Sequence, residues 1–333
     1  AHVEVPSHVC CLSARSEEAL RTLAERYAGA LATSAHELGD VCYTTNLGRS
    51  HFAQRVALVA PTLASLQEQL ATVARGDVEP KRAIGRGAAR IAFLFTATTA
   101  AEGRGRELYE LDARFRATLD RCDRVVTEML GTSLVAALYG GAWRAEVAKP
   151  AAVAIQIALA DLWQTWGIHP DLALGHSGGE YAAAAAVGAV SIEHAIALAC
   201  GGTKPETARA PSVPMISTAT GTRVTELGPD HWAQVGKEIQ IERASKELVR
   251  VGIDVFLELG APMFAGKSSG PGVWLPSLDP VATNDWDRMT ASLGALYERG
   301  LAPNWRAVYA GQTRVRVTLP GYPFERRPCW PEE

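Results

Sequence analysis

The sequence predicts an α/β fold built around a parallel sheet, and three observations support this. Residues 90–96 form an apolar run that is typical of a strand buried on both faces. Strand-like and helix-like segments then alternate along the chain, as they do when helices connect parallel strands. The segment Gly175-His176-Ser177-Gly178-Gly179 lies between an expected strand and an Ala-rich helix, which is a strand–turn–helix context.

The first part of the chain predicts a smaller α/β arrangement. Its expected elements are a strand over 8–13, a helix over 16–31, a strand over 55–60 and a helix over 63–74. Residues 76–85 are polar and rich in Gly and Pro, so a domain boundary is expected there.

The second part carries the main sheet and a proline-rich end. Its expected elements are the strand over 90–96, helices near 107–130 and 151–166, a strand over 172–174, helices after Ser177 and Ser191, and strands over 213–217 and 255–259. From Leu319 on, prolines are too frequent for a helix. We expect an extended tail that lies on a surface and is anchored by Tyr322, Phe324 and Trp330.

The turn around Ser177 has the features of a nucleophile elbow. Gly175, Gly178 and Gly179 keep the turn free of clashing side chains, so the serine hydroxyl can project from the sheet. The N–H of Gly178 and the positive end of the following helix would stabilise an oxyanion. Acyl transfer through a serine ester suits this geometry. The alternative is that the glycines only separate a strand from a helix.

Composition excludes several classes of function. The 333 residues are 47% hydrophobic and 21% charged with a net charge of −3, so neither nucleic acid nor an anionic membrane is an expected partner. The most apolar stretch, residues 181–192, is too short to span a bilayer. The six cysteines have no ligand spacing, which predicts buried thiols in a reducing cytoplasm and no metal site. No convincing phosphate loop is present, and we expect no bound cofactor.

Several stretches together resemble the acyltransferase domain of modular type I polyketide synthases with its flanking linkers. They are residues 11–14 with 48–52, residues 105–109 with 175–180, residues 254–260 with 274–278, and residues 319–330. The resemblance implies an α/β-hydrolase-like acyltransferase core with a parallel sheet, preceded by a small α/β linker domain. It assigns residues 1–85 to the ketosynthase-to-acyltransferase linker, residues 86–311 to the core and residues 312–333 to the post-acyltransferase linker.

Three features of that family are missing. A glutamine-bearing loop follows the first core strand in the family, whereas residues 97–102 contain no glutamine. An arginine after the elbow helix binds the carboxylate of a malonyl-type acyl group in the family, whereas residues 199–203 contain none. Family members also insert a ferredoxin-like small subdomain that carries the catalytic histidine. Here it is apparently absent, because the core is truncated around residues 201–212 and this bridge has no histidine.

Other histidines are poor replacements. His231 follows the serine in the chain and is a weak candidate for the base. The order Ser177, Asp230, His231 would also suit a thioesterase of the α/β-hydrolase type, but an adjacent acid and histidine rarely form such a relay. His176 adjoins the nucleophile and would point elsewhere at a sharp turn. The resemblance implies that it supports the bound acyl group.

The leading hypothesis is therefore a catalytically degenerate acyltransferase-like domain of a polyketide synthase. It would act as a scaffold for an upstream ketosynthase and an acyl carrier protein, while a separate acyltransferase loads the extender unit in trans. The alternative is an active acyl-CoA:acyl-carrier-protein S-acyltransferase that works through acyl-Ser177, whose lost arginine predicts an acyl group without a free carboxylate. Phosphopantetheine would belong to the carrier protein. The parent synthase is expected to be cytoplasmic and homodimeric, and this chain an excised part of it.

Overall fold

The computed structural model describes residues 4–83, 89–96, 102–202, 208–237, 239–260, 272–278 and 284–324. The chain divides into two compact units, residues 1–88 with 293–333 and residues 89–292. Residues 293–311 pack with the N-terminal residues because Arg55 Nη1 donates to the carbonyls of Tyr297 and Leu301, each at 2.9 Å. Compact units need not coincide with family domains, so the boundaries at 85 and 311 stay predictions.

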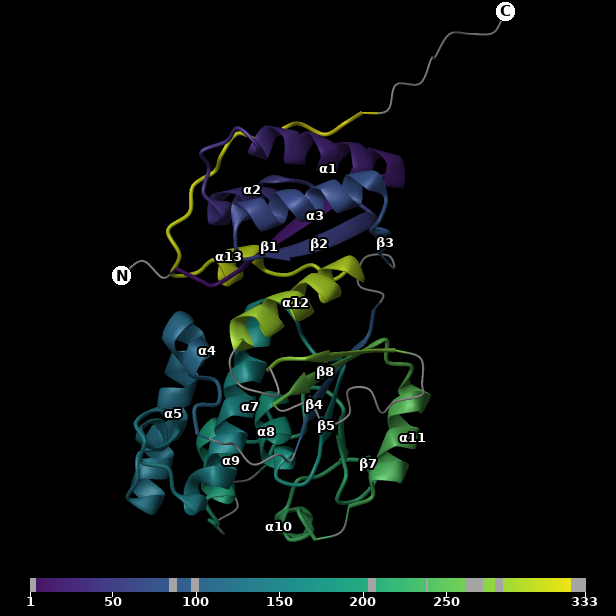
Figure 1. Ribbon diagram of the computed structural model, residues 1–333. Coiled ribbons are helices and arrows are strands. Elements are labelled where there is room, and N and C mark those ends of the chain that lie inside the picture. The colour runs from purple at the N-terminus through teal and green to yellow at the C-terminus, as the bar shows by residue number, and fades with distance from the viewer. Residues whose placement is uncertain are drawn as a thin grey trace, which may run out of the picture. The chain divides into compact units, whose positions relative to one another are not determined.

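The first unit is a small antiparallel sheet covered by helices (Figure 1). Its elements are β1 His8–Ala14, α1 Glu17–Leu31, α2 Leu38–Gly48, β2 Gln54–Ala60, α3 Leu63–Arg75, β3 Lys81–Arg82 and α13 Trp305–Val308, with sheet order β1-β2-β3. Hydroxyl caps begin the predicted helices: Ser16 Oγ accepts from Ala19 N and Thr62 Oγ1 accepts from Ser65 N, each at 3.1 Å. Apolar residues of α1 and α3 pack on β1 and β2 to form the core.

The helix α2 was not expected from the sequence. Its segment contains two glycines, two threonines and an asparagine, which are weak helix formers. Tertiary hydrogen bonds stabilise it instead. Asp40 Oδ1 accepts from Val315 N and Thr44 Oγ1 accepts from Val317 N, each at 3.0 Å. The helix and the C-terminal tail therefore stabilise each other.

The tail is extended over its described residues, as predicted, but its anchors differ. Tyr322 Oη accepts from Arg15 N at 3.0 Å, and its ring lies 5.3 Å from that of Phe52. Phe324 is 83% exposed, so its predicted anchoring role is wrong. Its ring lies 5.1 Å from that of Tyr322, two residues away, measured between centroids. Trp330 lies outside the described residues.

The second unit contains the predicted parallel sheet. Its strands are β4 Ile91–Phe95, β5 Leu172–Gly175, β6 Met215–Ser217, β7 Thr222–Arg223, β8 Val255–Leu259 and β9 Val273–Pro276, in the order β7-β6-β5-β4-β8-β9. All neighbouring pairs are parallel except β6 and β7. The predicted α/β class is therefore confirmed. The carboxyl ends of β4, β5 and β6 lie side by side, which positions the turn after β5.

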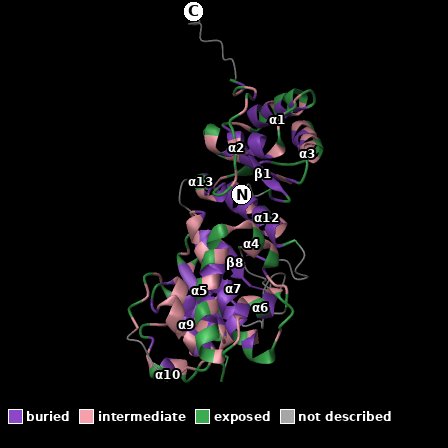
Figure 2. Cartoon of the chain, turned by 90° about the vertical axis from the view of Figure 1, so that its left-hand side faces the viewer, coloured by how far each residue is buried: buried purple, intermediate pink, exposed green. Residues whose placement is uncertain are grey.

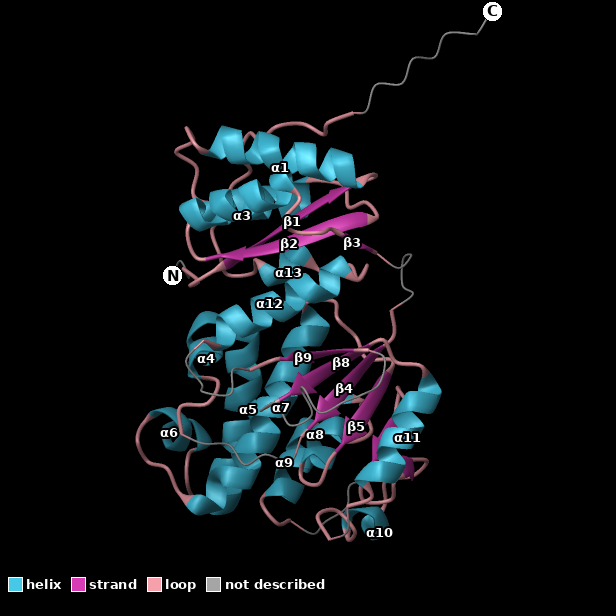
Figure 3. Cartoon of the chain, turned by 45° about the vertical axis from the view of Figure 1, so that its right-hand side comes forward, coloured by secondary structure: helices cyan, strands magenta, loops and turns pink. Residues whose placement is uncertain are grey.

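Helices cover both faces of this sheet (Figure 3). The helices of this unit are α4 Arg106–Leu111, α5 Ala113–Leu130, α6 Leu134–Tyr139, a 3₁₀ turn Ala145–Val147, α7 Ala148–Thr165, α8 Gly179–Ala186, α9 Ile192–Ala199, α10 Pro229–Trp232 and α11 Ile241–Val251. Of these, α7, α8 and α11 contact the strands. A further helix, α12 Asp285–Glu298, begins in this unit and ends in the first. The apolar side of α11 packs on one face of the sheet. The buried α7, seen in Figure 2, lies with α8 on the other.

The single helix expected near 107–130 is in fact two. Asp112 has an extended backbone with φ −114° and ψ 118°, which ends α4. Its Oδ1 then accepts from Arg114 N at 2.8 Å and Phe115 N at 2.9 Å, so the same residue caps α5. The apolar periodicity continued across this break and concealed it.

Two expectations from composition concern the cysteines and membrane-spanning helices, and both can be compared with the described residues. Cys10, Cys11, Cys42 and Cys122 are buried free thiols, whereas Cys200 is partly exposed. Among the helices that the structure describes, none combines the length and apolar character needed to cross a bilayer.

His8 makes the stability of the first unit depend on pH. It is 6% exposed, and its Nε2 lies 3.4 Å from Arg314 Nη2, an arrangement in which a neutral imidazole accepts from the guanidinium. Burial and then Arg314 lower the pKa of His8 to about 4, whereas an unfolded histidine titrates near pH 6.5. The unfolded chain therefore takes up a proton first as the pH falls.

We expect this histidine to reduce the unfolding free energy by up to about 3 kcal/mol between about pH 6.5 and pH 4. His8→Gln keeps an acceptor for Arg314 without a titrating ring, so it should flatten the pH dependence. Urea unfolding of both proteins across this range measures the difference. Equal slopes for the two proteins would contradict the assignment.

Candidate active site at the β5–α8 turn

Ser177 sits at the apex of a strained turn. The strand β5 ends at Gly175 and the helix α8 begins at Gly179. Ser177 has a φ of 49°, and no other non-glycine residue in the described ranges has a positive φ. A left-handed backbone costs such a residue about 1–2 kcal/mol. Strain of this kind concentrates at functional turns, so the geometry agrees with an elbow.

Two of the glycines are required by close packing. A Cβ on Gly175 would lie 2.7 Å from the Cα of Glu180. A Cβ on Gly179 would clash with the carbonyl oxygen of Phe95, at the end of β4. On Gly178 the nearest atom would be Lys149 Cε at 3.7 Å, an ordinary contact. The helix α8 therefore begins so close to the edge of the sheet that positions 175 and 179 have no room for a side chain.

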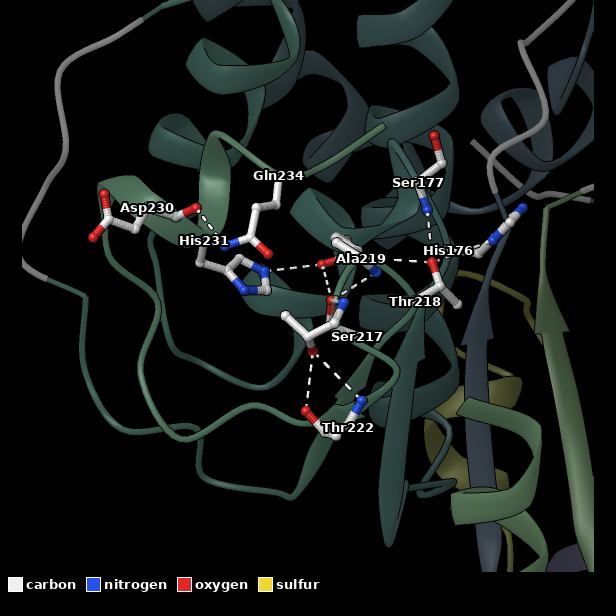
Figure 4. A network of polar contacts seen from close by, with 11 residues as sticks. His176, Ser177, Ser217, Thr218, Ala219, Thr222, Asp230, His231 and Gln234 are labelled. Carbon is white, nitrogen blue, oxygen red and sulfur yellow. Dashed lines mark hydrogen bonds and ion pairs between the residues drawn. The ribbon is translucent and has the colours of Figure 1, made fainter. Parts of the chain in front are cut away.

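The backbone at the turn is oriented by the neighbouring strand end. Ser177 N donates to Thr218 Oγ1 at 3.2 Å, and Figure 4 shows the serine hydroxyl pointing away from this contact. No residue of the described part of the chain hydrogen-bonds that hydroxyl or the N–H of Gly178. Within the described residues, both groups are therefore free of intramolecular hydrogen bonds. Gly236 comes close, since a Cβ there would lie 3.7 Å from Ser177 Oγ.

Glu180 is the buried centre of the polar network. Its side chain is fully buried. Oε2 accepts from Ser217 Oγ at 2.7 Å and contacts His231 Nε2 at 2.9 Å, while Oε1 accepts from Ala219 N at 2.9 Å. A buried carboxylate without such partners would be strongly destabilising. These contacts connect α8 to the end of β6 and to α10.

His231, the weak candidate for the base, is engaged by this carboxylate. Its Nε2 faces Glu180, and its ring also lies 5.0 Å from that of Trp232. Figure 4 shows Thr218 and Ala219 between His231 and Ser177, and the carboxylate of Asp230 pointing away from the imidazole. The structure therefore brings His231 to Glu180 rather than to Ser177. It does not form the acid–histidine relay of a thioesterase from Asp230 and His231.

His176 is buried on the other side of Ser177. Its backbone N–H donates to the Phe95 carbonyl at 2.9 Å, and its ring Nδ1 lies 3.3 Å from Thr218 Oγ1. Burial lowers the pKa of His176 below its usual value, which keeps the ring neutral at pH 7. Figure 4 shows the imidazole of His176 and the hydroxyl of Ser177 pointing away from the backbone in different directions. Support of an acyl group by His176 stays a prediction.

The connection after the elbow is short. The helix α9 ends at Ala199 and β6 begins at Met215, so residues 200–214 make the whole connection. A segment of this length is too short to form a subdomain with its own core. Residues 203–207 of this connection lie outside the described residues. So does the loop 97–101, where the glutamine of the resembling family would stand.

Comparison with known families assigns the central part of the chain. A family described as "Acyl transferase domain" matches residues 93–220, which include the elbow and its neighbouring strand ends. The chain contains an acyl transferase domain. A second family, described as "CurL-like, PKS C-terminal", matches residues 8–70 of the first unit. In the described part of the acyl transferase chain, no three His, Cys, Asp or Glu side chains are grouped as metal ligands.

Several curated relatives of this chain are polyketide synthases. Polyketide synthase GfsA of Streptomyces halstedii is 25% identical over 96% of the chain, and the spectinabilin polyketide synthase system protein NorC of Streptomyces orinoci is 30% identical over 96%. The non-reducing polyketide synthase aoiG of Aspergillus oryzae is 34% identical over 83%. The chain spans only 6%, 15% and 14% of these proteins, respectively.

Solved acyltransferase domains share the fold. The acyl transferase domain of ZmaA has a TM-score of 0.85 at 20% identity and covers 96% of this chain and 100% of its own. The acyltransferase domain from module 8 of the salinomycin polyketide synthase has a TM-score of 0.77 at 19% identity, covering 92% and 99%. The predicted acyltransferase fold is therefore confirmed.

Sequence reasoning missed three residues around the elbow. Glu180 was read only as part of the motif, Thr218 only as the end of a strand, and Lys149 was not considered. Parallel sheet order could have indicated Thr218, because adjacent strands end at the same edge. Lys149 could have been noticed as the one charged residue in the run 147–160, in which Gln156 is the one other polar side chain.

Substitution of the two adjacent glycines tests the packing of the elbow. We expect Gly179→Ala to lower the unfolding free energy by roughly 3 kcal/mol, because the added methyl group meets the Phe95 carbonyl. Gly178→Ala is the matched control and should change it by less than about 0.5 kcal/mol, since the new contact is ordinary. Urea unfolding of both variants measures this. Similar losses in the two would show that the close approach is absent.

Proposed function

We propose that this acyl transferase domain acts as a structural platform in a polyketide synthase and does not load acyl groups itself. It would support an upstream ketosynthase and an acyl carrier protein, with the extender unit supplied in trans by a separate acyltransferase. The relatives that match along most of this chain are polyketide synthases, which supports such partners. A reducing cytoplasm suits its buried free thiols.

The single observation that carries this proposal is the pairing of His231 with Glu180. The imidazole that could serve Ser177 contacts a buried carboxylate at 2.9 Å, and moving it away would leave that carboxylate undercompensated. Within the described residues, no imidazole hydrogen-bonds Ser177 Oγ. Loss of the base from a serine–histidine pair leaves only a small residual rate.

The length of the chain gives independent support. The alignment with GfsA extends over 433 positions, whereas this chain has 333 residues, so at least 100 of those positions have no counterpart here. This agrees with the short connection between α9 and β6. The segment that bears the histidine in the resembling family is the one this connection would replace.

One observation favours a second candidate function. The strained backbone of Ser177 and the available N–H of Gly178 are what an active acyl-CoA:acyl-carrier-protein S-acyltransferase would need. In that reaction Ser177 Oγ would attack the thioester carbonyl and release the CoA thiol. The thiol of the carrier protein would then take the acyl group from the serine ester.

Intact-protein mass spectrometry separates the two candidates. After incubation with malonyl-, methylmalonyl- or acetyl-CoA, we expect no adduct on the wild-type chain, because Ser177 lacks a base. Ser177→Ala, treated in the same way, is the control for acylation elsewhere. An adduct on the wild type alone, formed at an ordinary enzymatic rate, would overturn the platform proposal and support the second candidate.

A further inference from the structure

The first unit contains a pocket that is separate from the elbow. Its volume is about 720 Å³, and all of its lining residues belong to this unit. They come from β1, from α1, from the end of α2 with the loop that follows it, and from the tail. The side chains that determine its chemistry are four aromatic rings and two guanidinium groups, those of Arg15, Tyr27, Arg49, Phe52, Tyr322 and Phe324.

One wall of this pocket is a row of aromatic rings. The Tyr322 ring lies 5.3 Å from that of Phe52 and 5.1 Å from that of Phe324, measured between centroids. Aromatic rings attract one another at such separations, so a further ring could extend the row. The row ends in Phe324, which is 83% exposed. Apolar surface of this size in water favours an occupant that covers it.

The pocket also carries positive charge. The guanidinium of Arg15 lies 5.5 Å from the centre of the Phe52 ring, and that of Arg49 donates to the Leu319 carbonyl at 2.9 Å. Within the described residues, neither arginine forms an ion pair with a carboxylate. An occupant that combines an aromatic ring with carboxylates therefore suits this pocket.

The chain itself continues from the pocket wall with residues of this kind. Residues 325–333 follow Phe324 and lie outside the described residues. They contain Trp330 and, beyond it, the acidic side chains of Glu332 and Glu333. Six extended residues span up to about 20 Å, so the sequence allows Trp330 to return to the pocket from Phe324.

We propose that residues 325–333 fold back and place the indole of Trp330 in this pocket. The ring would stack on the aromatic row, and Glu332 or Glu333 would pair with Arg15. A segment tethered at the rim competes at an effective concentration of about millimolar, which favours it over a free ligand of the same chemistry. The proposal goes beyond the platform role and does not depend on Ser177. A protein that uses the same pocket would have to displace the tail first.

Fluorine NMR of the full-length chain, labelled with 5-fluorotryptophan, tests the proposal at the indole itself. The chain has eight tryptophans, and the resonance of Trp330 is the one that disappears in Trp330→Phe. Its shift between H₂O and D₂O measures exposure, and a synthetic peptide of residues 325–333 gives the value for an undocked ring. If docking is favoured tenfold, about 1.4 kcal/mol, this isotope shift should fall to about a tenth of the peptide value.

Two variants of the pocket test where the ring is held. Phe52→Ala removes one ring of the aromatic row and should return the Trp330 resonance to its position in the peptide. Arg15→Gln removes a charge and should raise the isotope shift about twofold to fivefold, as the loss of a surface ion pair implies. Val315→Ala is the matched control, because Val315 is an exposed apolar residue of the same tail that does not line the pocket. It should leave the resonance unchanged.

A Trp330 resonance at the peptide position in the unmodified chain would overturn the proposal and leave the pocket open to another protein. A displaced resonance that responds to neither pocket variant would also overturn it, because the ring would then be held elsewhere. The resonance of Trp305, which is buried in α13, shows whether the first unit of Phe52→Ala stays folded. If that unit unfolds, Arg15→Gln decides alone, since Arg15 is exposed.

Discussion

The buried carboxylate of Glu180 is the interaction on which the elbow depends. It is removed from water, so every hydrogen-bond donor around it contributes to keeping the charged group tolerable. Those donors come from the end of β6 and from α10, far from Glu180 along the chain. The carboxylate thus fixes the start of α8, the end of β6 and the orientation of His231 together. A histidine with this structural task is poorly placed to take part in proton transfer at Ser177.

The strained turn and the loss of the base that we propose are compatible because they have different physical origins. The geometry of Ser177 follows from close backbone contacts of Gly175 and Gly179 and from the hydrogen bond to Thr218. These contacts belong to the packing of α8 against the sheet and persist whether or not the serine reacts. General-base catalysis depends on a side chain that must be brought in from elsewhere. A domain can therefore keep an elbow as part of its core after losing the chemistry.

Sequence patterns predicted what is determined locally. Short apolar runs predicted the strands β4, β5 and β8, and therefore the parallel sheet. The glycines on either side of Ser177 predicted the tight turn. The helix α2 could not, since its weak helix formers depend on hydrogen bonds from the tail. Likewise, the pairing of Glu180 with His231 joins residues 51 positions apart, and no local pattern specifies such a contact.

The first unit is assembled from the two ends of the chain. Its sheet and helices precede residue 89, while the segment that pairs with α2 and receives the hydrogen bonds of Arg55 comes after residue 292. During synthesis, at about 5–20 residues per second, its N-terminal part must wait until the entire second unit has left the ribosome. The second unit can fold from one continuous stretch in the meantime. Within residues 1–333, the N-terminal segment is therefore synthesised before the second unit but completes its structure after it.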